Sequence, residues 1–530
     1  MDSPARAPLP TPSATGWRWL ALPGFVLLCW ALAVRHLSSE WMLNEQYHYG
    51  WTVPPLTLYL LRLRLERLPT PLPLLRTGWI ALGLLLVALA EALLLPVREA
   101  NADWRLLGWL LTALACTATL LTCAQAGGLP WLVRLAFPAL FFFIAVPWPR
   151  ALEINVMQGL MLSNAQLSAE LLHWFGMAAE VQGNLIRLPS GLVGVDQACS
   201  GIRSLQGSIM TTLFVGEIFE LTFLRRGFLL LAGAGWALVT NVGRTMFLAW
   251  AAGQGGDAAL DRWHDSAGLW VLAACVIGVT LTGWVLGRTR KSGRAKRLTS
   301  PATPPSNAGG WRRRLAAPAP FALAAVLLIV AAWGGSESWY RHNERTITRI
   351  ADWHFQQPTA ATRFEFLEQS RVTRAELRFD LHSGGRWNDA EGRLWVAHYF
   401  CWNPGRNAVR SVLVHDPRVC LGATGKEWVQ TLPELRHSVG SLVLPFDCYW
   451  FREQGQDVYV FNGVVEDAVR GPGHMPEGTE LTRASRLDAV RAGKRNLGQR
   501  RLEVAVWGAR DAASARLDFE TLLQAQIRVE

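Results

Sequence analysis

Long apolar runs, separated by short polar and basic loops, dominate the first 330 residues of the sequence. A helix that crosses the hydrocarbon core of a bilayer needs about 20 predominantly apolar residues. The runs that meet this pattern lie at 18–34, 78–96, 106–124, 131–147, 205–221, 228–250, 268–287 and 317–334. A ninth run, 51–62, is shorter and contains Pro54 and Pro55. The pattern predicts a polytopic α-helical membrane protein with about eight or nine transmembrane helices.

One segment between these runs has a different pattern. Residues 150–176 carry polar groups that are costly in hydrocarbon, namely Glu153, Asn155, Gln158, Asn164, Gln166, Glu170 and His173. We therefore expect an amphipathic or partly re-entrant helix on the outer surface of the membrane.

Beyond residue 335 the pattern changes to period-two segments that are typical of half-buried strands. They are RAELRFDLHS, RLWVAHYF, SLVLPFDCYWF and DVYVFNGVV, and the closing DAASARLDFETLLQAQIRV has helical spacing. This part is predicted to be a soluble α+β domain. The expected organisation is a cytoplasmic tail (1–17), a membrane domain (18–290), a basic, Pro/Ser/Gly-containing cytoplasmic linker (291–316), a transmembrane anchor (317–334) and the soluble domain (335–530).

Composition supports a membrane protein, since 51% of the 530 residues are hydrophobic and only 18% are charged. The net charge of +11 comes from arginines that cluster at the ends of the apolar runs. Basic residues near span ends remain on the cytoplasmic side, so the charge indicates topology and we expect no nucleic-acid partner. The basic loops 62–77, 222–227 and 288–316 then all lie in the cytoplasm, and the soluble domain lies outside.

Cys199 stands apart from the other cysteines because it lies at a boundary, in DQACSGIRSLQG, where an apolar helix is predicted to begin near Ser200. That helix reaches Arg225 after about 26 residues, or roughly 39 Å, which places Cys199 at the outer surface. A helix N-terminus favours a thiolate, and Arg203 adds positive charge. The alternative, a small apolar filler, is the interpretation we give to Cys29, Cys116, Cys123 and Cys275.

Two further residues are predicted at the same depth. Arg244 lies inside a predicted span, where an arginine is expensive and indicates function by default, and Asn241 lies three residues earlier on the same helical face. The alternative is an arginine that extends to the outer headgroups. His264 precedes the span 268–287 by a few residues and is also predicted at the outer surface. A thiol, a guanidinium and an imidazole in one layer form a coherent set for acyl transfer.

These motifs resemble those of the exosortase/archaeosortase family. The resemblance rests on ACSGIRS, NVGRT and HDSAG in that order, on WMLNEQYHYGWTVPPLTLYLLRLR, and on VQGNLIRLPSGLVGVDQACSG, the hairpin before the cysteine. The tetrapeptide at 47–50 departs from the family's usual Ser-His-Gly pattern, which puts a role for His48 in doubt.

The resemblance implies a membrane cysteine peptidase or transpeptidase that needs no cofactor. Cys199 would be the nucleophile, Arg244 the arginine that binds the oxyanion or the substrate, and His264 the acid–base, with Asp196 or Asp265 orienting the histidine. The implied substrates are membrane-anchored proteins with a C-terminal Pro-Glu-Pro sorting signal, cleaved at the periplasmic face of a bacterial inner membrane. The acyl group would pass to water or to a lipid or polysaccharide acceptor.

The segment 317–530 resembles the exopolysaccharide-associated periplasmic domain found beside or fused to exosortases, through HDPRVCLGATGKEW. Cys401, Cys420 and Cys448 provide one disulfide with a thiol left over, or buried structural cysteines, and the sequence does not choose between these. Their spacing lacks paired cysteines, so we expect no metal site. The alternative function for the whole chain is a noncatalytic component of exopolysaccharide assembly or export.

Overall fold

The computed structural model describes residues 17–72, 76–183, 185–188, 191–194, 201–288, 310–369, 374, 377, 379–405, 417–418, 421, 426–440, 442–470, 483–495 and 497–529. The chain forms two compact units. The first consists of residues 1–98, 104–149 and 288–337, and the second of residues 99–103, 150–287 and 338–530. The predicted boundary between a membrane domain and a soluble domain is therefore not the boundary between the compact units.

The long helices of the first unit are mostly apolar, as expected of helices surrounded by lipid. Its elements are η1 (Arg18–Leu20), α1 (Ala21–Leu43), η2 (Glu45–Thr52), α2 (Val53–Leu65), α3 (Thr77–Ala100), α4 (Arg105–Gly127), α5 (Leu129–Phe141), η3 (Phe142–Ala145), α10 (Gly310–Ala316) and the first part of α11 (Ala319–Glu344). Helices α1, α3, α4 and α11 share one core, in which small residues such as Ala115 and Ala322 allow close approach. Helix α10 lies within the predicted linker.

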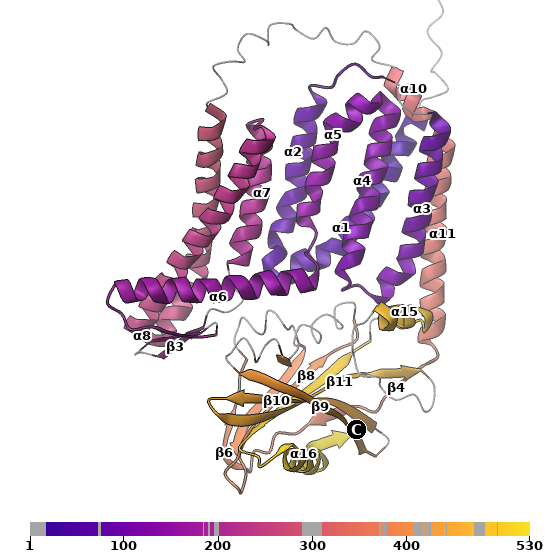
Figure 1. The fold of residues 1–530 in the computed structure, drawn as a ribbon. Coiled ribbons are helices and arrows are strands. Elements are labelled where there is room, and N and C mark those ends of the chain that lie inside the picture. Colours follow the sequence, from indigo (N-terminus) through magenta and orange to yellow (C-terminus); the bar gives the residue numbers. More distant parts are fainter. Residues whose placement is uncertain are drawn as a thin grey trace, which may run out of the picture. The chain divides into compact units, whose positions relative to one another are not determined.

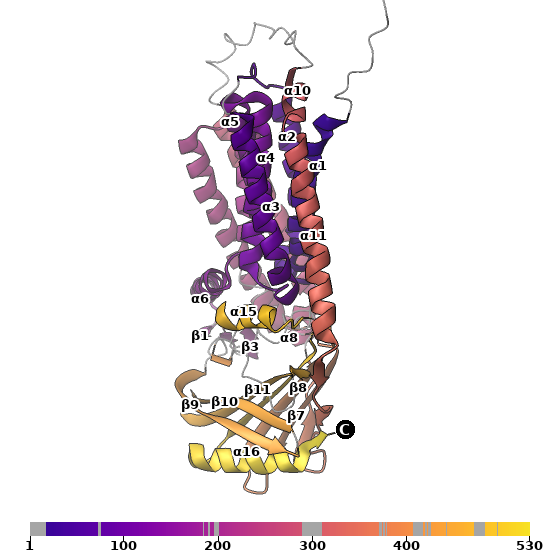
Figure 2. The ribbon, with the colours of Figure 1, turned by 90° about the vertical axis from the view of Figure 1, so that its right-hand side faces the viewer.

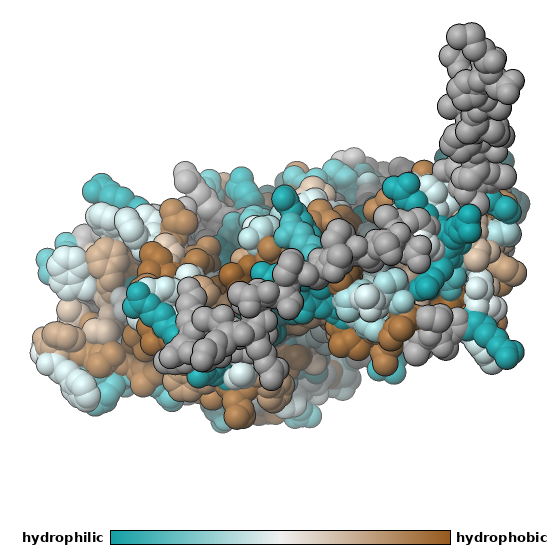
Figure 3. Space-filling model, turned by 90° about the horizontal axis from the view of Figure 1, so that it is seen from above, coloured by the Kyte–Doolittle hydropathy of each residue, from teal (hydrophilic) through white to brown (hydrophobic). Residues whose placement is uncertain are grey.

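Six helices in the described part of the chain are long and apolar enough to cross a membrane. They comprise Arg18–Leu43, Thr77–Ala100, Arg105–Gly127, Phe223–Gln254, Ser266–Arg288 and Ala319–Glu344, and the broken pair Leu129–Ala145 and Arg150–Trp174 adds a seventh if it counts as one span. The chain is thus a polytopic helical membrane protein, and the total of eight or nine spans stays a prediction. The space-filling view in Figure 3 shows hydrophilic residues among hydrophobic ones.

In the second unit, helix α6 (Arg150–Trp174) packs against α7 (Ile202–Ile218) and the middle of α8 (Phe223–Arg288). Figure 1 shows α6 running across the direction of α7. Between α6 and α7 lies an antiparallel sheet of β1 (Glu180–Gln182), β2 (Leu185–Leu188) and β3 (Gly191–Gly194). The hairpin expected before the cysteine motif is therefore present, with a third strand added.

Helix α8 folds back on itself as an antiparallel hairpin with arms Phe223–Gln254 and Ser266–Arg288. Side-chain contacts of described residues join the two arms. Arg225 donates to the carbonyl oxygen of Leu286 at 2.8 Å, Trp236 donates to the Thr282 hydroxyl at 3.4 Å, and the Thr240 hydroxyl lies 3.1 Å from the Cys275 sulfur. The sum of the two residue numbers stays nearly constant along these pairs, which fixes the register of the two arms.

Glycines let α7 and the two arms of α8 approach closely. A Cβ on Gly278 would lie 2.5 Å from the Trp236 ring, and a Cβ on Gly283 would lie 2.4 Å from Val215 of α7. Neither position has room for a methyl group, so both glycines are required by packing. The three helical segments consequently form one close-packed group.

The C-terminal part of the second unit, predicted above to be soluble and called the soluble domain below, contains a seven-stranded antiparallel sheet in the order β6-β7-β8-β13-β11-β10-β9. Its strands are β6 (Thr362–Phe366), β7 (Leu381–Asn388), β8 (Leu394–Trp402), β9 (Glu427–Val439), β10 (Leu442–Glu453), β11 (Gln456–Glu466) and β13 (Gln499–Trp507). Two small pairs flank it, β4 (Ile347–Arg349) with β12 (Ala468–Arg470) and β5 (Trp353–Phe355) with β14 (Ile527–Val529).

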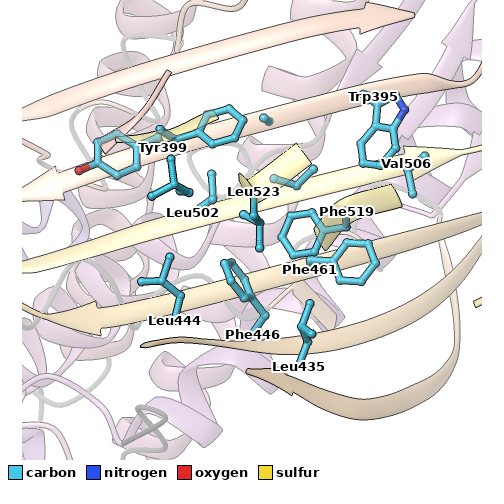
Figure 4. Close-up of a cluster of buried hydrophobic side chains, with 14 of the residues drawn as sticks. Trp395, Tyr399, Leu435, Leu444, Phe446, Phe461, Leu502, Val506, Phe519 and Leu523 are labelled. Atoms are coloured by element: carbon cyan, nitrogen blue, oxygen red, sulfur yellow. The ribbon is translucent and has the colours of Figure 1, made fainter. Parts of the chain in front are cut away.

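Helix α16 (Ala512–Gln526) covers one face of this sheet (Figure 2). Its Phe519 and Leu523 point into a core with Phe446, Phe461 and Leu502 from the strands (Figure 4). Phe461 stacks on Phe519 at 4.2 Å between ring centroids. An N-terminal capping box, Asp511 with Ser514, fixes the start of α16.

The sequence predicted four strands of the seven-stranded sheet, one of them only in part, and the closing helix, but not β6, β9 or β13. The strands expected at 393–400, 441–451 and 457–465 and the closing helix are present. The expected strand 374–383 is wrong in its first half, because β7 begins only at Leu381 and the described positions 374 and 377 are helical.

A short helix, α15 (Arg483–Arg491), contacts the segment 99–103 of the same unit: Arg486 donates to both carboxylate oxygens of Asp103, at 3.0 and 2.8 Å.

Candidate functional site

The register of the α8 hairpin brings Arg244 next to the second arm. Arg244 lies in the first arm and is 8% exposed. A Cβ built on Gly268 would lie 3.6 Å from Nη2 and 3.7 Å from Cζ of Arg244, so the guanidinium rests against the backbone of the second arm. His264 lies one helical turn before Gly268 in the sequence. Arg244 and the backbone of His264 are therefore close along the hairpin.

Asn241, one turn before Arg244, connects this region to the start of α7. Asn241 is 3% exposed. A Cβ on Gly201 would lie 2.8 Å from both Cγ and Nδ2 of Asn241, so the backbone at Gly201 touches the Asn241 side chain. Gly201 is the N-cap of α7 and has φ of +83°, a left-handed conformation that glycine adopts readily. The helix thus begins at Ile202, two residues later than expected.

Helix α6 adds polar groups to the same region. Nδ2 of the buried Asn164 donates to the Thr245 hydroxyl at 2.7 Å, and the buried Ser168 lies one turn further on. A small cavity of about 30 Å³ adjoins Asn164 and is large enough for a water molecule. Its lining residues are Leu160, Asn164, Gly201, Leu205, Ala234, Ala237, Leu238 and Asn241.

The structure assembles part of the predicted set of site residues. Arg244, Asn241 and Gly201 of the cysteine motif come together. Arg203 is exposed in the first turn of α7. Of His264 and Asp265 only the backbone, which is helical, is described.

Three predicted residues, Cys199, Asp196 and Cys420, lie outside the described residues.

Sequence reasoning missed Asn164 and Thr245 as neighbours of the site. The polar residues of 150–176 were expected to keep the helix at the membrane surface. Glu153 and Asn164 instead face the protein interior, whereas the other five polar residues of the segment are exposed. The signal for Asn164 was its position in an otherwise apolar stripe with Met157, Met161 and Ala165, but its partner lies 81 residues away.

The two described cysteines of the soluble domain are not joined to each other. Cys401 and Cys448 are both free thiols. Burial, with a contribution from Asp467 and Asp380, raises the pKa of Cys401 to about 11, and burial raises the pKa of Cys448 to about 11. Neither is a thiolate at neutral pH, and Cys448 packs in the core of the sheet. Cys401 also borders a groove of about 750 Å³, lined by Asp380, Tyr399 and Arg500 among others.

Residues 41–281 match the family model described as "Transmembrane exosortase (Exosortase_EpsH)". Over this range the chain is similar to the transmembrane exosortase family. The match contains all three sequence motifs, the α7 N-terminus and nearly the whole α8 hairpin. No curated protein and no solved structure matches the chain. The resemblance inferred from the motifs is thereby confirmed for the membrane part, whereas the relationship of the soluble domain stays a prediction.

Proposed function

We propose that this exosortase-family protein is a membrane-embedded cysteine peptidase or transpeptidase with Cys199 as nucleophile, Arg244 as anion-binding group and His264 as acid–base. The observation that carries the proposal is the contact between Gly201 and Asn241, which joins the cysteine motif to the arginine motif. Cys199 precedes Gly201 by two residues, and two peptide units span at most about 7.6 Å. The proposal places the thiol close to the region that holds Asn241 and Arg244.

In the proposed reaction the Cys199 thiolate attacks the carbonyl carbon of the scissile peptide bond, after its proton has passed to His264. The carbonyl oxygen becomes an oxyanion that Arg244 stabilises with its planar pair of N–H donors. Collapse of this intermediate breaks the C–N bond, and His264 protonates the departing amine. The product is a thioester on Cys199, which water or an amine then resolves. The apolar surroundings of the arginine strengthen its contact with an anion.

The proposed substrates are exported proteins that carry a C-terminal Pro-Glu-Pro signal, one apolar helix and a basic tail. The substrate helix in the bilayer would hold the signal at the depth of Cys199, which supplies proximity without a deep groove. We further propose a location in the bacterial inner membrane with the site and the soluble domain on the periplasmic side, and coupling to surface anchoring and exopolysaccharide production. The acceptor would be a lipid or a polysaccharide, and no cofactor is required.

The test is co-expression of each variant with a tagged substrate, followed by blotting for the processed form. Cys199→Ala should abolish processing, while Cys123→Ala, a part-buried cysteine of the first unit, should process at the wild-type rate. Arg244→Lys should lose on the order of 100- to 1000-fold in rate, because a point charge does not replace the planar fork. Mass spectrometry of the new C-terminus distinguishes hydrolysis from transfer.

Wild-type processing by Cys199→Ala would refute the thiol mechanism. The alternative, a noncatalytic role in exopolysaccharide assembly or export, would then take its place. That alternative predicts polysaccharide defects that follow the abundance of the protein and are insensitive to the thiol.

A further inference from the structure

The groove of about 750 Å³ that Cys401 borders lies on one face of the seven-stranded sheet. Leu381 of β7, Cys401 of β8 and Arg500 of β13 are neighbours in the strand register and form one row of its floor. Ser383 and Tyr399 form the next row, on the same face as the core that α16 covers. Figure 4 shows the Tyr399 hydroxyl pointing away from the Phe519 side of that core.

The rest of the lining gives the groove an extended shape and an apolar border. Residues 354–357, which belong to β5 and the loop after it, line the groove at consecutive positions along the backbone. Phe366 at the end of β6 is 67% exposed, and Leu381 is 54% exposed. Sites for drug-sized ligands have volumes of about 300–1,000 Å³. The groove is therefore large enough for a short extended segment with one long side chain.

Gln357 gives the groove a buried hydrogen-bond acceptor. Its side chain is 7% exposed, and its Nε2 donates to the carbonyl oxygen of Ser383 at 3.1 Å. Its Oε1 is buried and has no hydrogen-bond partner among the described residues. A Cβ on Gly385 would lie 2.4 Å from this oxygen, so glycine at 385 leaves the space that the amide occupies. A buried acceptor without a donor is costly, and a ligand with N–H groups would remove that cost.

The charged groups of the groove carry an excess of negative charge. Arg500 uses its donors within the protein, since Nε donates to Asp467 at 3.0 Å and Nη2 pairs with Asp352. Its Nη1 donates to the carbonyl oxygen of Trp353. The exposed Asp380 has no cationic partner in the described part of the chain. Three carboxylates and one guanidinium leave an excess of two negative charges.

The thiol of Cys401, on the floor of the groove, responds to this charge. Burial raises its pKa to about 11, and the carboxylates of Asp467 and Asp380 add to the rise. The thiol is therefore protonated at neutral pH and adds nothing to the charge of the groove. An anionic ligand would be repelled here, whereas a cationic ligand would be attracted.

We propose that this groove binds an extended polypeptide segment through an arginine side chain. A guanidinium presents planar N–H donors to a carboxylate such as Asp380 and to Oε1 of Gln357. Its apolar stem would pack along Leu381, and its head would stack on the exposed ring of Phe366. The hydroxyl groups of a neutral sugar would also reach the acceptors, but they would gain nothing from the excess negative charge. This binding site does not depend on the proposed peptidase activity.

The test is isothermal titration calorimetry on the full-length protein in detergent. The probes are the peptide acetyl-Ala-Leu-Arg-Leu-Ala-amide and its analogues with Gln or Glu in place of Arg. At low salt the Arg peptide should bind about tenfold more tightly than the Gln peptide, and the Glu peptide should not bind. Raising the salt to about 0.5 M should remove most of this preference. The net charge of +11 on the chain disfavours non-specific binding of a cationic peptide.

Variants at exposed positions locate the binding without disturbing the fold. Asp380→Asn should weaken binding of the Arg peptide roughly 2- to 5-fold, as expected for an exposed ion pair, and Asp380→Lys should abolish it and favour the Glu peptide. The matched control is Glu365→Gln, which removes the same charge beside Phe366 from a side chain on the opposite side of β6. It should bind like the wild type.

Three results would overturn the proposal. The first is no binding of the Arg peptide by the wild type at millimolar concentration. The second is equal affinity for the Arg, Gln and Glu peptides. The third is wild-type affinity for the Arg peptide in Asp380→Lys, which would place the binding elsewhere on the protein.

Discussion

Replacing Gly201 by alanine tests the link between the cysteine motif and the arginine motif. The backbone at Gly201 has φ of +83° and ψ of 1°. A non-glycine residue in this left-handed conformation costs about 1–2 kcal/mol. The added Cβ would also lie 2.8 Å from Cγ and Nδ2 of Asn241, a separation that real contacts do not show, so the start of α7 or the asparagine must move.

A free-energy change of 1.36 kcal/mol corresponds to a tenfold change in rate. If the whole backbone strain weakens the catalytic step, the processing rate should therefore fall by roughly 5- to 30-fold. Displacement of Asn241 adds to that. The matched control is Gly243→Ala, on α8 two residues beyond Asn241, where a Cβ meets nothing within 4 Å. Alanine there should be neutral or stabilise the helix by about 0.5–1 kcal/mol.

The assay is the rate at which a co-expressed tagged substrate is processed, normalised to the amount of inserted protein. Gly201→Ala should be slow, and Gly243→Ala should match the wild type. Combining Gly201→Ala with Asn241→Ala relieves most of the clash, so protein abundance should recover while processing stays low. If Gly201→Ala processes substrate as fast as Gly243→Ala, the contact between the two motifs has no part in the activity.

Three other predictions follow from the topology, the ion pairs and the titrating groups. A membrane-impermeant thiol reagent should label Cys199 in intact cells but not a cysteine placed at Arg290, and external labelling at 290 would contradict the assigned orientation. Arg486→Glu should destabilise the second unit by about 3–5 kcal/mol, because it removes the cation that pairs with the largely buried carboxylate of Asp103. The double variant Arg486→Glu with Asp103→Arg exchanges the two charges and should restore much of the thermal stability. No recovery in the double variant would mean that the pair is not an independent contact. Burial lowers the pKa of His382 to about 4 in the folded protein, against an ordinary 6.5, so the unfolded chain binds the proton more readily between these values. Thermal stability should therefore fall as the pH drops from 6.5 towards 4, and less so in His382→Gln.

The membrane helices were predictable because the side that packs against protein and the side that faces lipid both require apolar residues. The spans at 78–96 and 106–124 appear within α3 and α4, with ends moved by a few residues. The strand predicted at 374–383 failed because alternation of apolar and polar residues is only a local signal. Which residues join the sheet is set by pairing, and β7 has its register with β8 only from Leu381.

The candidate site was predictable where a single residue breaks a local rule. Arg244 was found because an arginine in an apolar run is costly, and its burial bears out that it faces protein. Asn164 breaks the same rule, yet its segment contains so many polar residues that a surface helix explained them all. By contrast, His382 of β7 and His398 of β8, whose ring nitrogens lie 3.2 Å apart, do not stand out from their local sequence. Only the fold, by joining distant segments, gives either feature its partners.

The glycine packing within α7 and the α8 hairpin has a consequence for how this part of the protein can evolve. Its outward side carries large, exposed apolar residues such as Leu231, Leu269 and Trp270, where one oily side chain can replace another with little effect. Positions such as Gly278 and Gly283 have no such freedom, since any larger residue would separate the helices that hold the arginine. In a library of random variants, tolerance should therefore alternate along one helix, permissive towards lipid and restrictive towards its neighbours. Sequence drift would leave the small residues behind as a fixed pattern inside a changing apolar background.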